Sequence, residues 1–321
     1  MNAKTTFNNI IDLSKATFQG FSDNKVTKLS GSLAYSTIFS MGPLLIVLIY
    51  LCSLFLGHKA AEGKIISYLQ DFLGYDTAHQ LEDIITKAAI NSNGHIAIII
   101  GVVMLLLGAT SIFGEIQDSI NDIWGLKPKP KKGWLKMVQN RLLSFSVIIS
   151  LGFLLLVSLS VTAFIDSCSK HLAAMFPHIT ITIFYVLNQI ITFIVITLIF
   201  GVIFKVLPDA TIKWKDILGG AIVTAVLFMA GKSGISFYIS KSNVGSTYGA
   251  AGSLIVLLLW IYYSSIILYI GAEFTKAYAV KYGSSIHPNE YTVTTKQVEI
   301  ETGKSTVQEK EQSTNQISLK K

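Results

Sequence analysis

Six long stretches of this sequence are almost free of charged residues, and each is long enough to cross a bilayer. A hydrocarbon core about 30 Å thick needs roughly 20 apolar residues in a helix that rises about 1.5 Å per residue. Backbone N–H and C=O groups find no water in hydrocarbon, and continuous apolar runs lack the alternation of a barrel strand, so these segments are predicted to be helices. The stretches are Leu29–Gly57, Ala88–Gly114, Leu142–Ile165, Ile179–Phe204, Ile217–Ser240 and Ser242–Ala272.

The predicted fold is all-α: a polytopic membrane protein whose six transmembrane helices form one bundle, with amphipathic helices at the membrane interface. Composition agrees, because 51% of the residues are hydrophobic and only 14% are charged. Three regions are expected. Residues 1–28 form an amphipathic N-terminal segment, residues 29–285 form the six-helix domain, and residues 286–321 form a polar tail that is predicted to be disordered.

The amphipathic segment is predicted from spacing. Phe7, Ile10, Ile11 and Phe18 recur at nearly helical intervals, with polar residues between them. Such a helix is expected to lie along the lipid interface. The loop after the first span repeats this pattern twice between residues 65 and 88, which indicates a pair of surface helices or ordinary packing under a long loop.

The distribution of basic residues predicts the orientation. The net charge is +7, and the segments on one side of the membrane hold 20 Lys and Arg residues against 6 on the other. This positive-inside bias places both termini in the cytoplasm. Because topology accounts for the charge, no nucleic-acid partner is expected. Membrane lipids are the expected partners, and the sequence leaves the oligomeric state open.

A polar cluster follows the second apolar stretch. If the helix continues, Glu115, Asp118 and Asp122 share one face, and Gln117 and Asn121 lie nearby. One interpretation is a salt-bridge network that holds this helix end against its neighbour. The other is a proton or cation path entering from the cytoplasm, since ionisable groups at membrane depth are functional candidates.

Lys232 interrupts the fifth apolar stretch. Its long side chain could snorkel to the outer interface, or it could face the bundle and use an acceptor such as Tyr238, Tyr248, Asn188 or a helix carbonyl.

Glu273 closes the sixth stretch, with Lys276 as its expected local partner. Small residues are concentrated in the last two stretches, where they would let helices approach closely. They are Gly219, Gly220, Gly231, Gly234, Gly249, Ala250, Ala251 and Gly252.

No catalytic motif is found in the sequence. The six histidines show no zinc-ligand spacing, and there is no phosphate-binding loop and no Gly-x-Ser-x-Gly elbow. We therefore expect no enzyme activity, no metal site and no cofactor. Cys52 and Cys168 fall on the same predicted side, and whether they pair stays open.

These residues also carry a resemblance to the YihY/BrkB family of bacterial inner-membrane proteins, over roughly residues 10 to 280. Several of its motifs occur in order within matching spans. They are Gly31-Ser-Leu-Ala-Tyr-Ser-Thr-Ile-Phe-Ser40, Phe113-Gly-Glu-Ile-Gln-Asp-Ser-Ile-Asn-Asp-Ile-Trp-Gly125, Pro208-Asp209, Gly231-Lys-Ser-Gly-Ile-Ser-Phe-Tyr-Ile239, Tyr248-Gly-Ala-Ala-Gly252, Leu259-Trp-Ile-Tyr-Tyr263 and Gly271-Ala-Glu273.

The resemblance implies six transmembrane helices with cytoplasmic ends, in a bacterial inner membrane. Family members have carried a ribonuclease label or a virulence and serum-resistance label, and transport of lipids or their precursors has been suggested. Positions that match the family pattern, without assigned roles, are Gln117, Asp118, Asn121, Trp124, Asp209, Lys232, Tyr238, Tyr248, Gly249, Trp260 and Glu273.

Three hypotheses about function follow. The first is a transporter or exporter of unknown substrate, such as a lipid or envelope precursor, in which Asp118→Asn and Lys232→Met abolish function without loss of folding. The second is a non-catalytic scaffold for envelope assembly, whose function maps to the outer loop or the tail. The third is a membrane-bound hydrolase or ribonuclease, for which the residues offer no support.

Overall fold

The computed structural model describes residues 3–40, 94–128, 177–241, 252–283, 285–289 and 292–295. Long helices make up most of this part of the chain, which also contains four short strands: two follow α5 and α7, and two follow α10. The helices are α1 (Ala3–Asp23), a helical segment over residues 26–40, α5 (Gly94–Trp124), α7 (Pro177–Val206), α8 (Trp214–Lys241) and α10 (Gly252–Tyr282). The strands are β1 (Leu126–Pro128), β2 (Ala210–Thr211), β3 (His287–Pro288) and β4 (Thr292–Thr294).

Three helices in the described residues are long and apolar enough to cross a membrane: Val186–Val206, Trp214–Ile235 and Leu254–Tyr282. The predicted third span and much of the first lie outside the described residues, as do both cysteines and the outer loop. The last span differs from its prediction, because it continues about ten residues beyond Ala272. Alternating polar and apolar residues there extend the helix after the continuous apolar run has ended, so Glu273 lies inside α10.

The ends of α5 and α7 follow from local sequence. α5 continues through the polar cluster, as expected, and stops at Gly125, whose φ of +69° is a left-handed conformation that glycine adopts without a Cβ penalty. α7 stops at Val206 because Pro208 lacks a backbone N–H and disfavours helical conformation in the residue before it. Both helix ends lead directly into short strands.

Two short strands lie at the start of the C-terminal tail, within the residues 286–321 that were predicted to be disordered. β3 pairs with β2, in the connection between α7 and α8, and β4 pairs with β1, directly after α5; both pairs are antiparallel. The polar residues of the tail are ordered here because the backbone groups of two helix connections offer them hydrogen-bond partners. Residues 296–321 lie outside the described part of the chain.

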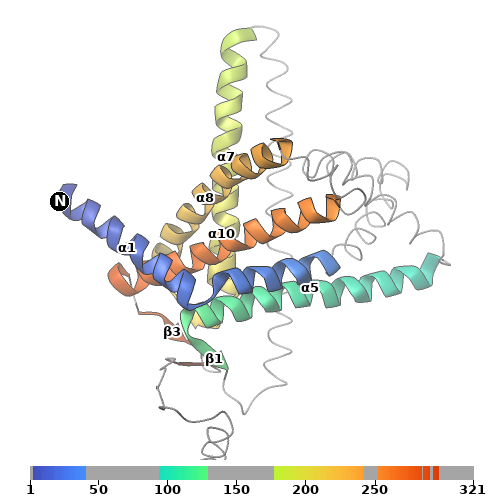
Figure 1. Cartoon of the computed structure of the whole chain (residues 1–321), viewed down its shortest axis with the longest axis horizontal. Coiled ribbons are helices and arrows are strands. Elements are labelled where there is room, and N and C mark those ends of the chain that lie inside the picture. Colours follow the sequence, from blue (N-terminus) through green and yellow to red (C-terminus); the bar gives the residue numbers. More distant parts are fainter. Residues whose placement is uncertain are drawn as a thin grey trace, which may run out of the picture.

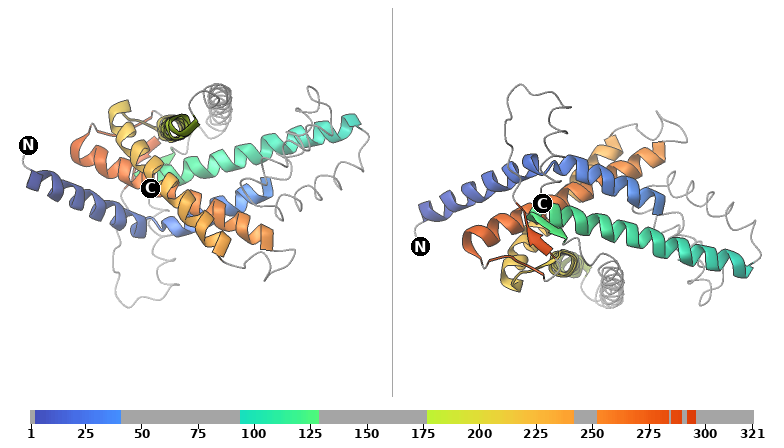
Figure 2. Two further views of the ribbon diagram at one scale, coloured as in Figure 1. Left: turned by 90° about the horizontal axis from the view of Figure 1, so that it is seen from above. Right: turned by 90° about the horizontal axis from the view of Figure 1, so that it is seen from below.

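The helices converge on the end of the molecule that carries the strands, which we call the strand end (Figure 1). α7 stands steeply to α5 and α10, and it is seen end-on in the views from above and below (Figure 2). The core lies at this convergence. Fully buried side chains from every described helix except α1 contribute to it, among them Val26, Ile120, Phe204, Ile217 and Tyr269.

α8 and α10 interlock through small residues. A Cβ added at Gly220 would collide with the Thr275 hydroxyl of α10, and one added at Gly271 would collide with the Thr224 hydroxyl of α8. Each threonine hydroxyl donates to the carbonyl of the glycine four residues before it, at 2.7 Å in both helices. The prediction that glycines allow close approach of the last two spans is therefore confirmed at Gly220, and Gly271, which was not among the small residues named for this role, acts in the same way.

α1 is helical as predicted and packs against α10. It is separated from the next helical segment by a turn at Asn24 and Lys25, where Lys25 has a φ of +51°. Near the C-terminal end of α10, Lys281 Nζ donates to Asp12 Oδ2 of α1 at 2.8 Å. This exposed ion pair lowers the pKa of the Asp12 carboxyl, chiefly through the hydrogen bond from Lys281.

Candidate functional site

Asp209 is the centre of a buried hydrogen-bond network at the strand end. Its carboxylate accepts from Gln117 Nε2 at 3.2 Å and from Asn121 Nδ2 at 3.0 Å, and its backbone N–H donates to Asn121 Oδ1 at 2.9 Å. The three side chains are each 7% exposed or less. Gln117 and Asn121 are one helical turn apart, so α5 presents both amides to the carboxylate together.

The C-terminal segment completes this network. The Asp209 carbonyl accepts from the Thr292 hydroxyl at 2.9 Å and from the Asn289 backbone N–H at 3.0 Å. Asp209 thus holds α5, the α7–α8 connection and the C-terminal strands in one arrangement. Amide hydrogen bonds to a buried carboxylate are stronger than neutral ones, which makes this network a strong structural tie.

Glu273 is the second buried carboxylate, and it lies within a candidate membrane span. It is 2% exposed, and its Oε1 accepts from Asn24 Nδ2 at 2.6 Å. Gly20 of α1 makes room for it, because a Cβ there would collide with the carboxylate. The turn after α1 is therefore pinned to α10 through this side chain.

The expected pairing of Glu273 with Lys276 is not the hydrogen bond that forms. Lys276 Nζ instead donates to the Ile123 carbonyl at the end of α5, at 2.5 Å. One turn of α10 earlier, the Ala272 carbonyl accepts from Trp124 Nε1 at 3.2 Å. The last carbonyls of a helix have no partner within it, and here one of them accepts from Lys276, while the Trp124 indole donates to α10. Glu273 accepts its hydrogen bond from Asn24 instead.

The structure separates the other predicted site residues. In α5, Asp118 and Asp122 are exposed, and Glu115 is half-buried. Lys232 of α8 is also exposed, so it does not join Asp118 in an interior cluster. The helix therefore turns its amides inward and two of its three carboxylates outward, although both sets share the same stretch of sequence.

The two tyrosines that were predicted as site residues have side chains that the structure does not describe. Tyr238 lies in α8, but its side chain is outside what the structure describes, and Tyr248 lies outside the described residues. Within the described ranges, no group of three or more His, Cys, Asp or Glu side chains could hold a metal ion.

Two residues of these networks had no role in the sequence analysis. Asp209 was noted only as part of the family pattern, and Asn24 was not singled out. A signal for Asp209 exists, since a carboxylate directly after a proline-terminated apolar helix lies near other helix ends. No local pattern indicates Asn24, because its partner is 249 residues away.

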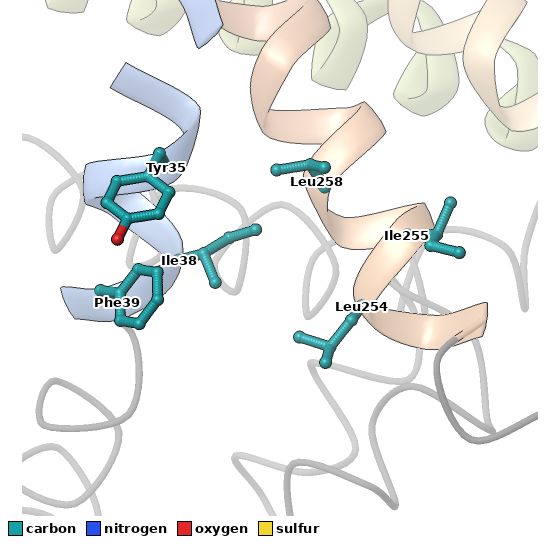
Figure 3. Close-up of a pocket in the computed structure, with 6 residues that line it drawn as sticks. All are labelled: Tyr35, Ile38, Phe39, Leu254, Ile255 and Leu258. Atoms are coloured by element: carbon teal, nitrogen blue, oxygen red, sulfur yellow. The ribbon is translucent and has the colours of Figure 1, made fainter. Parts of the chain in front are cut away.

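An apolar groove lies between residues 26–40 and the start of α10, with a volume of about 300 Å³ (Figure 3). Aromatic and aliphatic side chains form its lining, and the only polar side-chain atom among them is the Tyr35 hydroxyl. The lining residues are Tyr35, Ile38, Phe39, Leu254, Ile255 and Leu258. Such a surface can accept hydrocarbon, and it lies toward the opposite end of α10 from Glu273.

Comparisons with known proteins agree with the resemblance found in the sequence. The family model described as Virulence factor BrkB matches residues 17–292. A UPF0761 membrane protein of Mannheimia succiniciproducens is 25% identical over 258 residues, covering 79% of this chain and 85% of that protein. One of Haemophilus influenzae is 26% identical over 258 residues, covering 79% of this chain and 90% of that protein.

No solved structure matches the chain. The family match begins within α1 and ends at Thr292, so it includes Asp209, Glu273 and most of the residues that hold them. On this evidence the chain belongs to the BrkB family of membrane proteins.

Proposed function

We propose that this protein is a non-enzymatic transporter or exporter that uses Glu273 as its central ionisable group. The supporting observation is a carboxylate that is 2% exposed inside an apolar helix long enough to span a bilayer. A charge in the membrane interior costs about 3 kcal/mol or more, so such residues are seldom kept for packing alone.

The substrate class that fits best is a lipid or an envelope precursor with hydrocarbon chains. The apolar groove beside α10 supports this choice, because it offers hydrocarbon a surface next to a membrane-crossing helix (Figure 3). Membrane lipids are the proposed partners. We further propose a location in the bacterial inner membrane with the strand end in the cytoplasm, because the Lys and Arg residues favour that side.

A second candidate is a scaffold for envelope assembly. Two observations favour it: Asp118 and Lys232 are exposed, and the Asp209 network resembles a structural tie more than a transport path. In that case loss of function would map to the outer loop or to the tail, and Glu273 would act only through stability.

The test is lipid translocation by the purified full-length protein in liposomes. A fluorescent phospholipid is placed in both leaflets, and a membrane-impermeant reductant reports how fast the inner pool reaches the outside. We expect Glu273→Gln to slow translocation at least 10-fold. Asp118→Asn is the matched control and should leave the rate unchanged, in contrast to the expectation from sequence. Liposomes with wild-type protein that bleach no faster than empty ones would contradict a lipid transporter.

A further inference from the structure

Two hydroxyl groups in the core lack a hydrogen-bond partner. Ser30 Oγ and Tyr269 Oη are fully buried, and neither has a partner at good hydrogen-bonding geometry in the described part of the chain, although Ser119 is close enough to interact with Tyr269 Oη. Buried polar groups in folded proteins are nearly always paired with protein or ordered water, because an unpaired group loses the hydrogen bonds that it makes in bulk water.

Both hydroxyls belong to the junction of residues 26–40, α5 and α10. Ser119 of α5 lies beside the Tyr269 hydroxyl, and the Glu115 carboxylate is within electrostatic range of it. Ser30 is one turn after Val26 and just before Leu33, two residues that pack in the same core cluster as Tyr269. Ser30 thus lies on a helix that contributes to this core, and the Tyr269 hydroxyl faces α5 within it.

The same region lies between two carboxylates. Glu115 is one turn before Ser119 in α5, and Tyr269 is one turn before Glu273 in α10, each step about 6 Å along the helix axis. Residues one turn apart share a helix face, so Glu115 is a neighbour of Ser119 and Tyr269 is a neighbour of Glu273. Asp23 and Lys276 are the other charged groups that act on Glu273.

We propose that ordered water pairs with the buried Tyr269 and Ser30 hydroxyls, bridges Tyr269 to Ser119, and forms a proton relay between Glu115 and Glu273. Each step moves one proton along a hydrogen bond: a carboxyl gives a proton to water, the chain of water and hydroxyl groups passes one on, and the second carboxylate takes it up. No electron is transferred, and no bond other than O–H forms or breaks. The use of this relay rests on the proposed transport function, whereas the presence of the water does not.

Hydroxyl-radical labelling of the wild-type protein in liposomes tests the water directly. Radicals formed by radiolysis of a bound water attack the side chain next to it, even when that side chain is closed to solvent. We expect Tyr269 to be oxidised at least 10-fold faster than a buried aromatic side chain that has no bound water. Phe204, an equally buried aromatic residue in the same core, is the dry control. If Tyr269 reacts as slowly as Phe204, the proposal is wrong.

Removal of the hydroxyl gives an independent test. Tyr269→Phe should lower the midpoint of thermal unfolding if the hydroxyl binds water, and should raise it or leave it unchanged if the hydroxyl is unpaired. Ser30→Ala should change the midpoint in the same direction. Ser265→Ala is the control, because Ser265 is buried but already donates to the Ile261 carbonyl at 2.8 Å. A higher or unchanged midpoint in Tyr269→Phe overturns the proposal.

The relay itself is tested by proton uptake into liposomes under a membrane potential. Tyr269→Phe should reduce uptake at least 10-fold while Glu273 is intact. If Tyr269 labels rapidly but wild-type liposomes carry neither protons nor lipid, the transport function fails while the water site stands. If wild-type uptake is normal and Tyr269→Phe leaves it unchanged, the relay fails and the transport function stands.

Discussion

Asp209 and Glu273 are both buried carboxylates, but their surroundings differ. Asp209 follows a helix and accepts hydrogen bonds from two side-chain amides, while its backbone holds three more groups. Glu273 lies within a candidate span and accepts a hydrogen bond from Asn24, in the turn between two helices. The first arrangement ties distant segments together, and the second holds its carboxylate through one side-chain amide among the described residues.

This comparison predicts the largest loss of stability at Asp209. Asp209→Ala removes the acceptor of two buried amides and should lower the free energy of unfolding by about 3 kcal/mol. The measurement is thermal or denaturant unfolding in detergent. Asp118→Ala, on the exposed side of the same region, is the control and should change stability by less than about 0.5 kcal/mol. Equal effects at the two positions would remove the basis for calling Asp209 a structural tie.

The next largest effect is expected at the close contact between α8 and α10, near Glu273. Gly220→Ala forces its new methyl group against Thr275, two residues after Glu273, and should cost about 2 kcal/mol. Gly234→Ala is the matched control, since a Cβ there meets nothing within 4 Å. That control should gain about 0.5–1 kcal/mol because alanine favours the helix. A neutral Gly220→Ala would show that α8 and α10 can separate without cost.

Glu273→Gln should change stability by less than about 1 kcal/mol, because glutamine keeps the oxygen that accepts from Asn24. Translocation should nevertheless be lost, as proposed above. Unfolding and transport measured on the same preparation separate the two effects. A large loss of stability together with the loss of transport would make Glu273 a second structural tie and would favour the scaffold.

The smallest effect concerns pH and the exposed pair of Asp12 and Lys281. The pair holds the pKa of Asp12 below its ordinary value of 3.8. A carboxyl with a lowered pKa in the folded state stabilises that state above its unfolded pKa, and this contribution disappears as pH falls through the folded pKa.

The expected result is that α1 becomes more accessible to protease as pH falls below about 4, and that high salt weakens the effect. Asp12→Asn should remove this pH dependence, and Lys15→Gln, next to the pair on α1, should retain most of it. If α1 is equally protected at pH 3 and pH 6, the pair does not contribute to its docking.

Much of the helical structure could be predicted, because it depends on local composition. The bounds of α7 and α8 fall within three residues of the apolar stretches that predicted them. The C-terminal end of α10 was placed about ten residues too early, since its second half mixes polar and apolar residues and carries no continuous apolar run. The strands could not be predicted, because two or three residues that pair across the chain leave no periodic pattern.

The candidate site was predicted only in part. Gln117, Asn121 and Glu273 were named and are buried, whereas Asp118 and Lys232 were named and are exposed. Helical spacing shows which residues share a face, but it does not show whether that face points to a neighbouring helix or outward.

The sequence by itself determined that this is a helical membrane protein, and its motifs resembled the family to which the chain belongs. Both conclusions depend on composition and on the order of motifs along the chain, and neither requires knowledge of contacts. Only the tertiary structure decided which polar residues meet: Asp209 with α5 and Glu273 with Asn24. Those pairs join residues 88 to 249 positions apart, and their hydrogen bonds form only after the helices have packed.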